Sequence, residues 1–349
     1  MSARTSLFAL AAVFCAGALA TGGALAARDS GKSRVLALAF NGLPTATPAS
    51  GVDLAVSAGA RGSVLSYTWQ ELEPSPGRYA TRQMSGLRYF TQTRKLKVFL
   101  GLQVIETTVK ATPGDLVHVS FDAPEMKRRF RALVDALRPY LNENVTYISV
   151  GNGVDMYLAR HPAAWPAYRE FYADAARYLH SVAPWIKVGV TTTFSGAVRK
   201  ARRKVADLNR LSDVQMITYY PVQGLFQVRP PSVVLGDLRA LLEISGSRPL
   251  VLPEIGYPSA PALGSSQKQQ SAFVDALFSA WRRLGNRIPF LNLLYLHDLE
   301  PRACSDMAAF YGHARTEFRT FVCSLGFRQA DGSPKAAWKA LLTGASALR

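Results

Sequence analysis

The sequence predicts an α/β fold of the (β/α)8 TIM-barrel type, and three observations lead to this prediction. Eight short apolar runs that resemble buried strands alternate with stretches of helical periodicity. The length that follows an N-terminal leader, about 320 residues, is what eight strand–helix units require. Two of the runs end in a polar side chain where a loop begins, and barrels of this type place their active sites there.

Residues 1–27 have the features of a cleaved secretory signal. Arg4 is the only charge, residues 7–19 are apolar, and small residues in Ala-x-Ala settings follow. A large phenylalanine precedes Cys15 where a lipoprotein signal has a small residue, so cleavage is expected rather than lipid attachment. No later run reaches about 18 apolar residues, so no transmembrane segment is expected. The mature chain, residues 28–349, is predicted to be one secreted or periplasmic domain.

The predicted strands are rich in β-branched and other apolar residues, with Gly, Pro or Asn at their ends. The first of them, Arg-Val-Leu-Ala-Leu-Ala-Phe, stops at an Asn-Gly pair. No sequence repeat relates the eight units. In chain order the strands are expected at residues 34–40, 62–69, 95–106, 145–152, 186–193, 213–220, 248–254 and 288–297.

The intervening helices are predicted from apolar residues at three- and four-residue steps, such as Met126, Phe130 and Leu133. Asp122 precedes that helix as a capping residue, and Ser266 with Gln269 forms a capping box for a later one. The other helices are expected at residues 167–182, after the strand at 186–193, at 233–244 and at 333–342.

Two cysteines, Cys304 and Cys323, remain after removal of the signal. In an oxidising compartment a disulfide that closes this loop is expected, and two buried thiols are the alternative. The five histidines show no metal-ligand spacing with one another or with the cysteines. We therefore expect no metal site and no cofactor.

Basic residues outnumber acidic ones by 41 to 24, which gives a formal net charge of +17. The densest basic run covers residues 199–204, and a second cluster covers residues 127–131. Because the chain is predicted to be exported and carries no nucleic-acid motif, an anionic polysaccharide or an envelope surface is the expected partner of such a field, and no nucleic acid is expected. Ordinary solvated helix faces are the alternative.

Two strand ends carry polar residues that are expected to meet at one pocket. Glu254 ends the seventh run, and Asn152 ends the fourth. A single Glu in this place is more often a buried carboxylate held by an arginine or a backbone amide. The second polar strand end favours a catalytic group, because the carboxyl ends of all strands of a parallel barrel converge.

Four motifs in strand order resemble clan A glycoside hydrolases, the retaining (β/α)8 glycosidases. They are Trp69-Gln-Glu-Leu-Glu73-Pro-Ser-Pro-Gly77-Arg-Tyr79, Gly151-Asn152, Tyr219-Tyr220-Pro221 and Glu254-Ile-Gly256, which follow strands two, four, six and seven. The resemblance spans about residues 34 to 345. It implies a pocket for a β-linked sugar, so a carbohydrate is the expected substrate.

The resemblance implies that Glu254 is the nucleophile, that the hydroxyl of Tyr220 holds it, and that Asn152 contacts the sugar 2-hydroxyl. A retaining glycosidase also needs a carboxylic acid about 5 to 5.5 Å from the nucleophile to protonate the leaving oxygen. Aromatic faces against the sugar are expected from Trp69, Tyr157, Tyr219 and Tyr295, with His297 at the same mouth of the barrel. Packing in the core is the alternative for each, and it is strongest for Tyr219, which alternation directs away from Tyr220.

The chain departs from the family at position 153. Clan A enzymes have the acid/base Glu there, and this sequence has Gly153, which cannot donate a proton. General acid–base catalysis contributes about 10²- to 10⁴-fold, so the difference affects function.

Three explanations are open for this departure. The acid has moved, with Asp155 or Glu106 as candidates; the protein binds sugar without turnover; or it is an acid/base variant of an active hydrolase. Asp155 also fits a helix-capping residue, and Glu106 also fits an ion pair with Lys110.

Retention of Glu254 together with Tyr220 favours an O-glycosyl hydrolase with a modified acid step, because a binding protein needs neither residue. A protein of a different class, an exported accessory protein that binds an anionic polysaccharide through its basic surface, is the alternative. An aromatic groove across Glu254 would distinguish the two.

Overall fold

The computed structural model describes residues 34–41, 48–313 and 315–348, so the predicted signal at residues 1–27 lies outside the described part of the chain. The main sheet contains β1 (Val35–Leu38), β2 (Gly62–Thr68), β3 (Lys97–Glu106), β5 (Val145–Asn152), β6 (Lys187–Gly189), β7 (Thr191–Thr193), β8 (Gln215–Tyr219), β11 (Leu250–Ile255) and β12 (Phe290–Leu293).

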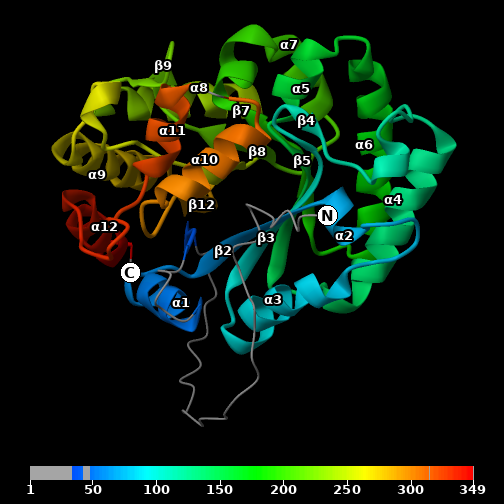
Figure 1. The fold of residues 1–349 in the computed structure, drawn as a ribbon, viewed down its shortest axis with the longest axis horizontal. Helices are drawn as coiled ribbons and strands as arrows, with labels where there is room; N and C mark the ends of the chain where they lie inside the picture. Colours follow the sequence, from blue (N-terminus) through cyan, green and yellow to red (C-terminus); the bar gives the residue numbers. More distant parts are fainter. Residues whose placement is uncertain (1–33, 42–47, 314, 349) are drawn as a thin grey trace.

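These strands form a nearly closed parallel barrel. Their order is β6-β5-β3-β2-β1-β12-β11-β8-β7, and every pair of neighbours along this path is parallel. The two ends of the path, β6 and β7, are separated in sequence only by Val190, so they are halves of one strand. The predicted (β/α)8 fold is therefore confirmed (Figure 1).

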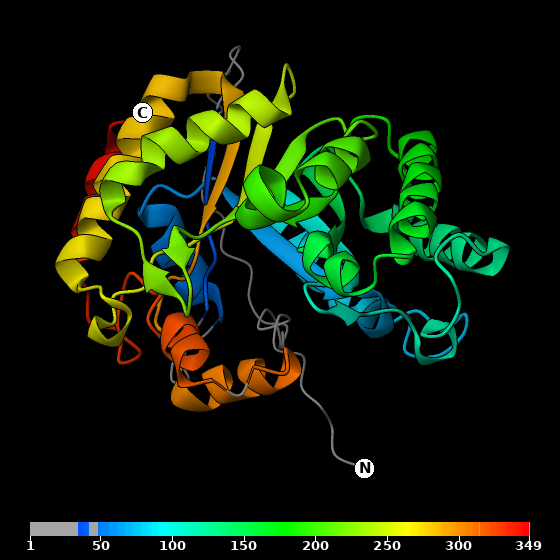
Figure 2. The ribbon, with the colours of Figure 1, turned by 90° about the horizontal axis from the view of Figure 1, so that it is seen from above.

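Helices surround the barrel on its outside, as Figure 2 shows from above. They are α1 (Pro48–Ser57), α2 (Trp69–Leu72), α3 (Ser85–Arg88), α4 (Pro124–Leu137), α5 (Val154–Arg160), α6 (Ala164–Val182), α7 (Arg202–Asn209), α8 (Val234–Ser245), α9 (Gln267–Leu284), α10 (Pro301–Phe310), α11 (Thr316–Cys323) and α12 (Ala336–Ser346). In the described ranges, none of them is long and apolar enough to cross a membrane.

Short strands and short helical turns connect the main elements. β4 (Val109–Lys110) adds antiparallel to β3, and β9 (Val222–Gln223) pairs with β10 (Gln227–Val228) in a hairpin. The short turns are η1 (Thr81–Met84), η2 (Tyr89–Thr93), η3 (Gly114–Leu116), η4 (Arg138–Tyr140), η5 (Gly196–Lys200), η6 (Pro231–Val233), η7 (Pro261–Leu263) and η8 (Gly285–Arg287).

Alternation along the strands builds two separate cores. Ala37, Phe99, Met216 and Phe290 cluster with one another inside the barrel. Leu36, beside Ala37 on β1, belongs instead to the large core between strands and helices. This is the period of two expected for strands whose two faces are both buried.

The start of α4 and the end of β12 differ from the sequence predictions for reasons that hydrogen bonds explain. α4 begins at Pro124 behind Ala123 without a side-chain cap, because the Asp122 carboxylate accepts a hydrogen bond from Ser120 instead. β12 ends at Leu293, because the chain beyond it bonds to loop residues such as Arg328. At α9 the expected cap is present, since the Ser266 hydroxyl accepts the Gln269 amide at 3.1 Å.

Cys304 and Cys323 form the expected disulfide, with their Cα atoms 5.7 Å apart. The bridge joins α10 to α11 within the segment that follows β12 and does not tie that segment to a barrel strand. The two helices were not predicted, and they share a small apolar core of their own with Leu299, Met307 and Phe321. The bridge therefore stabilises this segment directly.

Replacing both cysteines by alanine is expected to lower the free energy of unfolding by about 3 kcal/mol, because the bridge restricts the unfolded chain over a loop of this size. Denaturant titration of the variant beside the wild-type protein measures the difference. A loss below about 1 kcal/mol, or free thiols at both positions in unreduced wild-type protein, would contradict the prediction.

Candidate active site

Glu254 lies at the mouth of the barrel, at the end of β11. Its Oε2 accepts a hydrogen bond from the Tyr220 hydroxyl at 2.8 Å, and its Oε1 accepts one from Asn152 Nδ2 at 3.0 Å. These three residues end or follow β11, β8 and β5, so the sequence correctly brought them together. Burial raises the pKa of Glu254, and the two donated hydrogen bonds oppose that rise.

Asn152 holds a second carboxylate with the same nitrogen. Its Nδ2 also lies 3.3 Å from Oε1 of Glu106, the last residue of β3. The two Oε1 atoms are therefore no farther apart than the sum of these hydrogen bonds, 6.3 Å. Retaining glycosidases hold their carboxyl groups about 5–5.5 Å apart and inverting enzymes about 6.5–9.5 Å, so the spacing is compatible with the retaining geometry.

Glu106 is fully buried and its two oxygens differ in their surroundings. Its Oε1 accepts hydrogen bonds from the Tyr311 hydroxyl at 2.6 Å and the Thr107 hydroxyl at 2.9 Å, besides the Asn152 amide. Its Oε2 is buried and has no hydrogen-bond partner in the described residues. The ion pair with Lys110, the alternative explanation for Glu106, is absent from the ion pairs of the described residues, because Lys110 Nζ donates to the Val119 carbonyl instead.

Burial and the nearby Glu254 charge raise the pKa of Glu106 to about 8, although the three donated hydrogen bonds lower it. The carboxyl group is therefore mostly protonated at neutral pH. Because Oε1 already accepts from three donors, the proton belongs on Oε2. A carboxylic acid whose proton faces no protein acceptor is suited to donate that proton to a substrate.

A pocket lies beside Glu254 and enters the barrel on the side of β1, β2 and β12. It encloses about 910 Å³, including solvent at its mouth. Gln103 and Asn292 line it, and the side-chain oxygen of each is buried without a partner in the described part of the chain. The Asn292 amide nitrogen donates to the Pro253 carbonyl at 2.8 Å, which directs Oδ1 away from that carbonyl. These two oxygens can accept hydrogen bonds from sugar hydroxyl groups.

The pocket is otherwise largely apolar. Tyr295 lines it from the chain after β12, and Leu299, Ala303 and Met307 line it from α10 and the residues just before it. The α10–α11 pair thus forms one wall of the pocket. In the described ranges no cluster of three or more His, Cys, Asp or Glu side chains could hold a metal ion.

Gly153 occupies the start of α5 in a left-handed conformation, with φ of +54°. A Cβ atom placed there would lie 3.2 Å from Thr107 Oγ1 and 3.3 Å from Thr107 Cα. Thr107 is fixed in turn, since its amide donates to the Asn152 carbonyl at 2.8 Å. Position 153 therefore favours glycine for backbone reasons, and a longer side chain meets the strand that carries Glu106.

Asp155, the other candidate acid, turns away from Glu254. Its carboxylate accepts hydrogen bonds from the amide and the hydroxyl of Thr193, both at 2.7 Å, and the residue is buried. It does not cap its own helix, because it lies in the first turn of α5 and the cap position is Gly153. These contacts tie α5 to the end of β7, which is a structural role.

The expectation that Trp69 and Tyr219 face a sugar is wrong. Trp69 is 1% exposed and donates from Nε1 to Glu73 at 2.8 Å, because α2 directs its ring towards α4 and α6. Tyr219 has no exposed area, and its hydroxyl donates to Asp237 of α8 at 2.9 Å. Alternation along β8 points Tyr219 outward and leaves Tyr220 as the inward residue.

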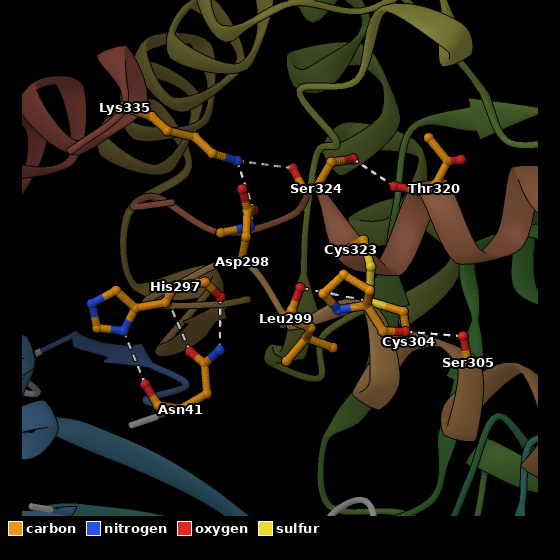
Figure 3. The surroundings of a disulfide bond; sticks show 12 residues. Asn41, His297, Asp298, Leu299, Cys304, Ser305, Thr320, Cys323, Ser324 and Lys335 are labelled. Atoms are coloured by element: carbon orange, nitrogen blue, oxygen red, sulfur yellow. Dashed lines mark hydrogen bonds and ion pairs between the residues drawn. A yellow bond between two sulfur atoms is a disulfide. The ribbon is translucent and has the colours of Figure 1, made fainter. Parts of the chain in front are cut away.

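His297 and Tyr157 are also engaged elsewhere. His297 is buried; its Nδ1 lies 3.0 Å from the Asn41 carbonyl and its backbone amide bonds the Asn41 side chain, as Figure 3 shows. Its predicted contact with sugar is therefore corrected to a tie between β1 and the chain after β12. Tyr157 is half-buried on α5 and stacks on His161, and it does not line the pocket beside Glu254.

Tyr311, Gln103 and Asn292 were not predicted. Gln103 and Asn292 lie inside strand runs, where a polar residue on an apolar β-strand is a signal that could have been used. Tyr311 follows α10, which has no motif, and reaches Glu106 across 205 positions of sequence. No local sequence pattern predicts a contact between residues so far apart in the sequence.

Solved structures of glycoside hydrolases resemble this fold. A GH5_18 from Bifidobacterium longum subsp. infantis matches with a TM-score of 0.70 and 15% identity, over 90% of this chain and 79% of that one. A Glu-to-Ala variant of a GH5_18 from Bifidobacterium longum subsp. longum, in complex with Manβ1-4GlcNAc, matches with a TM-score of 0.70 and 13% identity, over 90% and 78%.

An exo-β-1,4-mannosidase from Opitutaceae bacterium strain TAV5 matches with a TM-score of 0.69 and 17% identity, over 90% of this chain and 59% of that chain. Comparison of the sequence with protein-family models and with curated proteins gives no match. The structural neighbours are thus glycoside hydrolases of clan A, and at these identities the likeness is one of fold.

Changing Gly153 to Glu is expected to lower the free energy of unfolding by about 1–3 kcal/mol, because a side chain in the left-handed region is strained and this one also meets Thr107. Gly224→Glu is the matched control, since Gly224 has φ of +52° but open space around it. Denaturant unfolding of both variants should give the larger loss at position 153. Equal losses would show that the contact with Thr107 has no cost.

Proposed function

We propose that the protein is an exported retaining β-glycosidase in which Glu254 is the nucleophile and Glu106 is the acid/base. The observation that carries the proposal is the Asn152 amide, which binds one oxygen of each carboxyl group. It places the two groups at a separation that suits the retaining mechanism. Of the relocated acids that the sequence left open, Glu106 fits this geometry, whereas Asp155 is bound to Thr193.

In the first step Glu254 attacks the anomeric carbon, and the bond from that carbon to the leaving oxygen breaks. The proton on Glu106 Oε2 passes to the leaving oxygen. In the second step the Glu106 carboxylate takes a proton from water, whose oxygen displaces Glu254 and releases the sugar. Because Glu106 has no exposed area, a leaving oxygen reaches Oε2 only after neighbouring side chains rearrange around the bound sugar.

The pocket supports a neutral sugar as substrate. Its polar lining consists mainly of hydroxyl and amide groups, such as Gln103 and Asn292, and Glu254 is its acidic member. Because structural neighbours include a β-1,4-mannosidase and a GH5_18 with Manβ1-4GlcNAc bound, a β-mannoside is the first substrate to test.

Export is proposed from the leader-like residues 1–27, and the disulfide between Cys304 and Cys323 is consistent with an oxidising compartment.

A protein that binds sugar without turnover is the competing function. It predicts that binding persists while no glycoside is cleaved.

The glycosidase proposal is tested with Glu106→Gln, Glu254→Gln and Asp155→Asn against unactivated and dinitrophenyl β-mannosides. Glu254→Gln is expected to abolish turnover of both. Glu106→Gln should lower cleavage of the unactivated substrate by about 10²- to 10⁴-fold and affect the dinitrophenyl substrate less, since that leaving group needs no proton. Added azide, a nucleophile that needs no general base, should attack the glycosyl-enzyme of the Glu106→Gln variant in place of water, displace Glu254 and release a β-glycosyl azide.

The dependence of activity on pH gives an independent test of Glu106 as the acid. Glu106 must be protonated to donate, so wild-type activity on the unactivated substrate should fall as pH rises through about 8. If Asp155→Asn is instead the damaging variant, Asp155 is the acid. If Gly153→Glu raises turnover, the chain lacks an acid. If calorimetry detects sugar binding but no activated glycoside labels Glu254, the glycosidase proposal is wrong. The protein then binds sugar without turnover.

We further propose that the basic run at residues 199–204 contacts an anionic polymer. Its five basic side chains, Arg199, Lys200, Arg202, Arg203 and Lys204, are exposed, and no ion pair involves them in the described part of the chain. The second cluster differs, because Lys127 pairs with Glu170 and Arg131 with Asp174. Most of its charge is therefore neutralised.

Retention on an immobilised anionic polysaccharide should fall steeply as salt approaches 1 M, where the Debye length is about 3 Å. Replacing the five basic residues by glutamine should weaken retention at low salt. The matched control replaces Lys127, Arg128 and Arg131, which should change retention less. Equal effects of the two replacements would remove the assigned role of residues 199–204.

A further inference from the structure

The pair of helices α10 and α11 contacts the supports of both carboxyl groups. Tyr311, directly after α10, donates a hydrogen bond to Glu106 Oε1 at 2.6 Å. Phe321 of α11 packs edge-on against the Tyr220 ring with centroids 5.3 Å apart, and Tyr220 holds Glu254. The disulfide joins the two helices (Figure 3). A segment outside the barrel thus reaches the two groups assigned to catalysis.

From these contacts we propose that Tyr311 is a positioning residue for the acid/base Glu106, an inference that rests on the function proposed above. By occupying Oε1, the Tyr311 hydroxyl keeps the carboxyl group in one orientation and leaves Oε2 to carry the proton. A hydrogen bond donated to a carboxylate also favours its charged form, so Tyr311 sets the pH at which Glu106 gives up that proton.

The other groups around Glu106 do not duplicate this role. The titratable groups that face it are Glu254 from β11, Tyr311 after α10, and Tyr220 and Tyr295 at the barrel mouth. Tyr220 donates to Glu254, whose charge disfavours ionisation of Glu106. Among these tyrosines, Tyr311 is the one that donates to Glu106 in the hydrogen bonds of the described residues.

Removing the hydroxyl with Tyr311→Phe is expected to move the basic limb of kcat/KM upward by about one pH unit, because the charged form of Glu106 then loses a hydrogen bond that favours it. It should lower kcat on unactivated glycosides about 10-fold by freeing the carboxyl group to rotate. Release of dinitrophenolate in the first turnover should change little, since that step needs no acid.

Tyr178→Phe is the matched control. Tyr178 donates to the Asp135 carboxylate at 2.7 Å, on the outer face of α6 and away from the site. It loses the same kind of hydrogen bond and should leave the basic limb in place. If both variants shift the limb equally, the effect is structural and the role assigned to Tyr311 is wrong.

Titration of 13C-labelled Glu by NMR, with the Glu106 signal assigned through Glu106→Gln, measures the Glu106 pKa without any turnover. It separates the two proposals. An upward shift in Tyr311→Phe of a protein that cleaves no glycoside supports the contact and contradicts the glycosidase. An unchanged Glu106 pKa in an active Tyr311→Phe enzyme contradicts the role of Tyr311 alone.

If Tyr311→Phe does not fold, 3-fluorotyrosine at position 311 keeps nearly the same volume and makes the hydroxyl a stronger donor. The Glu106 pKa should then move downward, opposite to the effect of phenylalanine. No movement in this variant would also overturn the proposal.

Discussion

Two carboxyl groups at the mouth of the barrel share the amide nitrogen of Asn152, and the rest of the site is arranged around this contact. Like charges at such a distance in a buried setting do not both ionise at neutral pH, so one of the groups keeps a proton. Glu254 is partly exposed and accepts two hydrogen bonds, whereas burial and the nearby Glu254 charge raise the pKa of the enclosed Glu106 to about 8. The proposed function uses this difference, because it assigns the two glutamates different roles on the basis of their surroundings.

The residues packed around Asn152 also explain why a glycine occupies position 153. Asn152 is held from one side by the Thr107 backbone amide, and Thr107 fills the space that a side chain at position 153 would need. The strand that supplies Glu106 is therefore the one that leaves no room at position 153. A glycine at position 153 therefore fits the packing of the two strand ends.

The barrel and the trio of Glu254, Tyr220 and Asn152 could be predicted, because parallel strands converge at their carboxyl ends whatever loops join them. Side-chain direction beyond a strand end is less determined, so Trp69, which follows β2 on a short helix, was wrongly assigned to the pocket. Tyr311 could not be found, since α10 and α11 depend on a disulfide and a local apolar core rather than on the strand–helix repeat.

Because a disulfide joins α10 to α11, the redox conditions under which the protein is produced affect this part of the structure. Protein made in the reducing cytosol of a production host would emerge with Cys304 and Cys323 as thiols, and the wall of the pocket beside Met307 would lose its cross-link. Two preparations of identical sequence would then differ in the stability of the α10–α11 segment according to where they were oxidised. Production in a periplasm, or an oxidation step during purification, is therefore needed to obtain the bridged form.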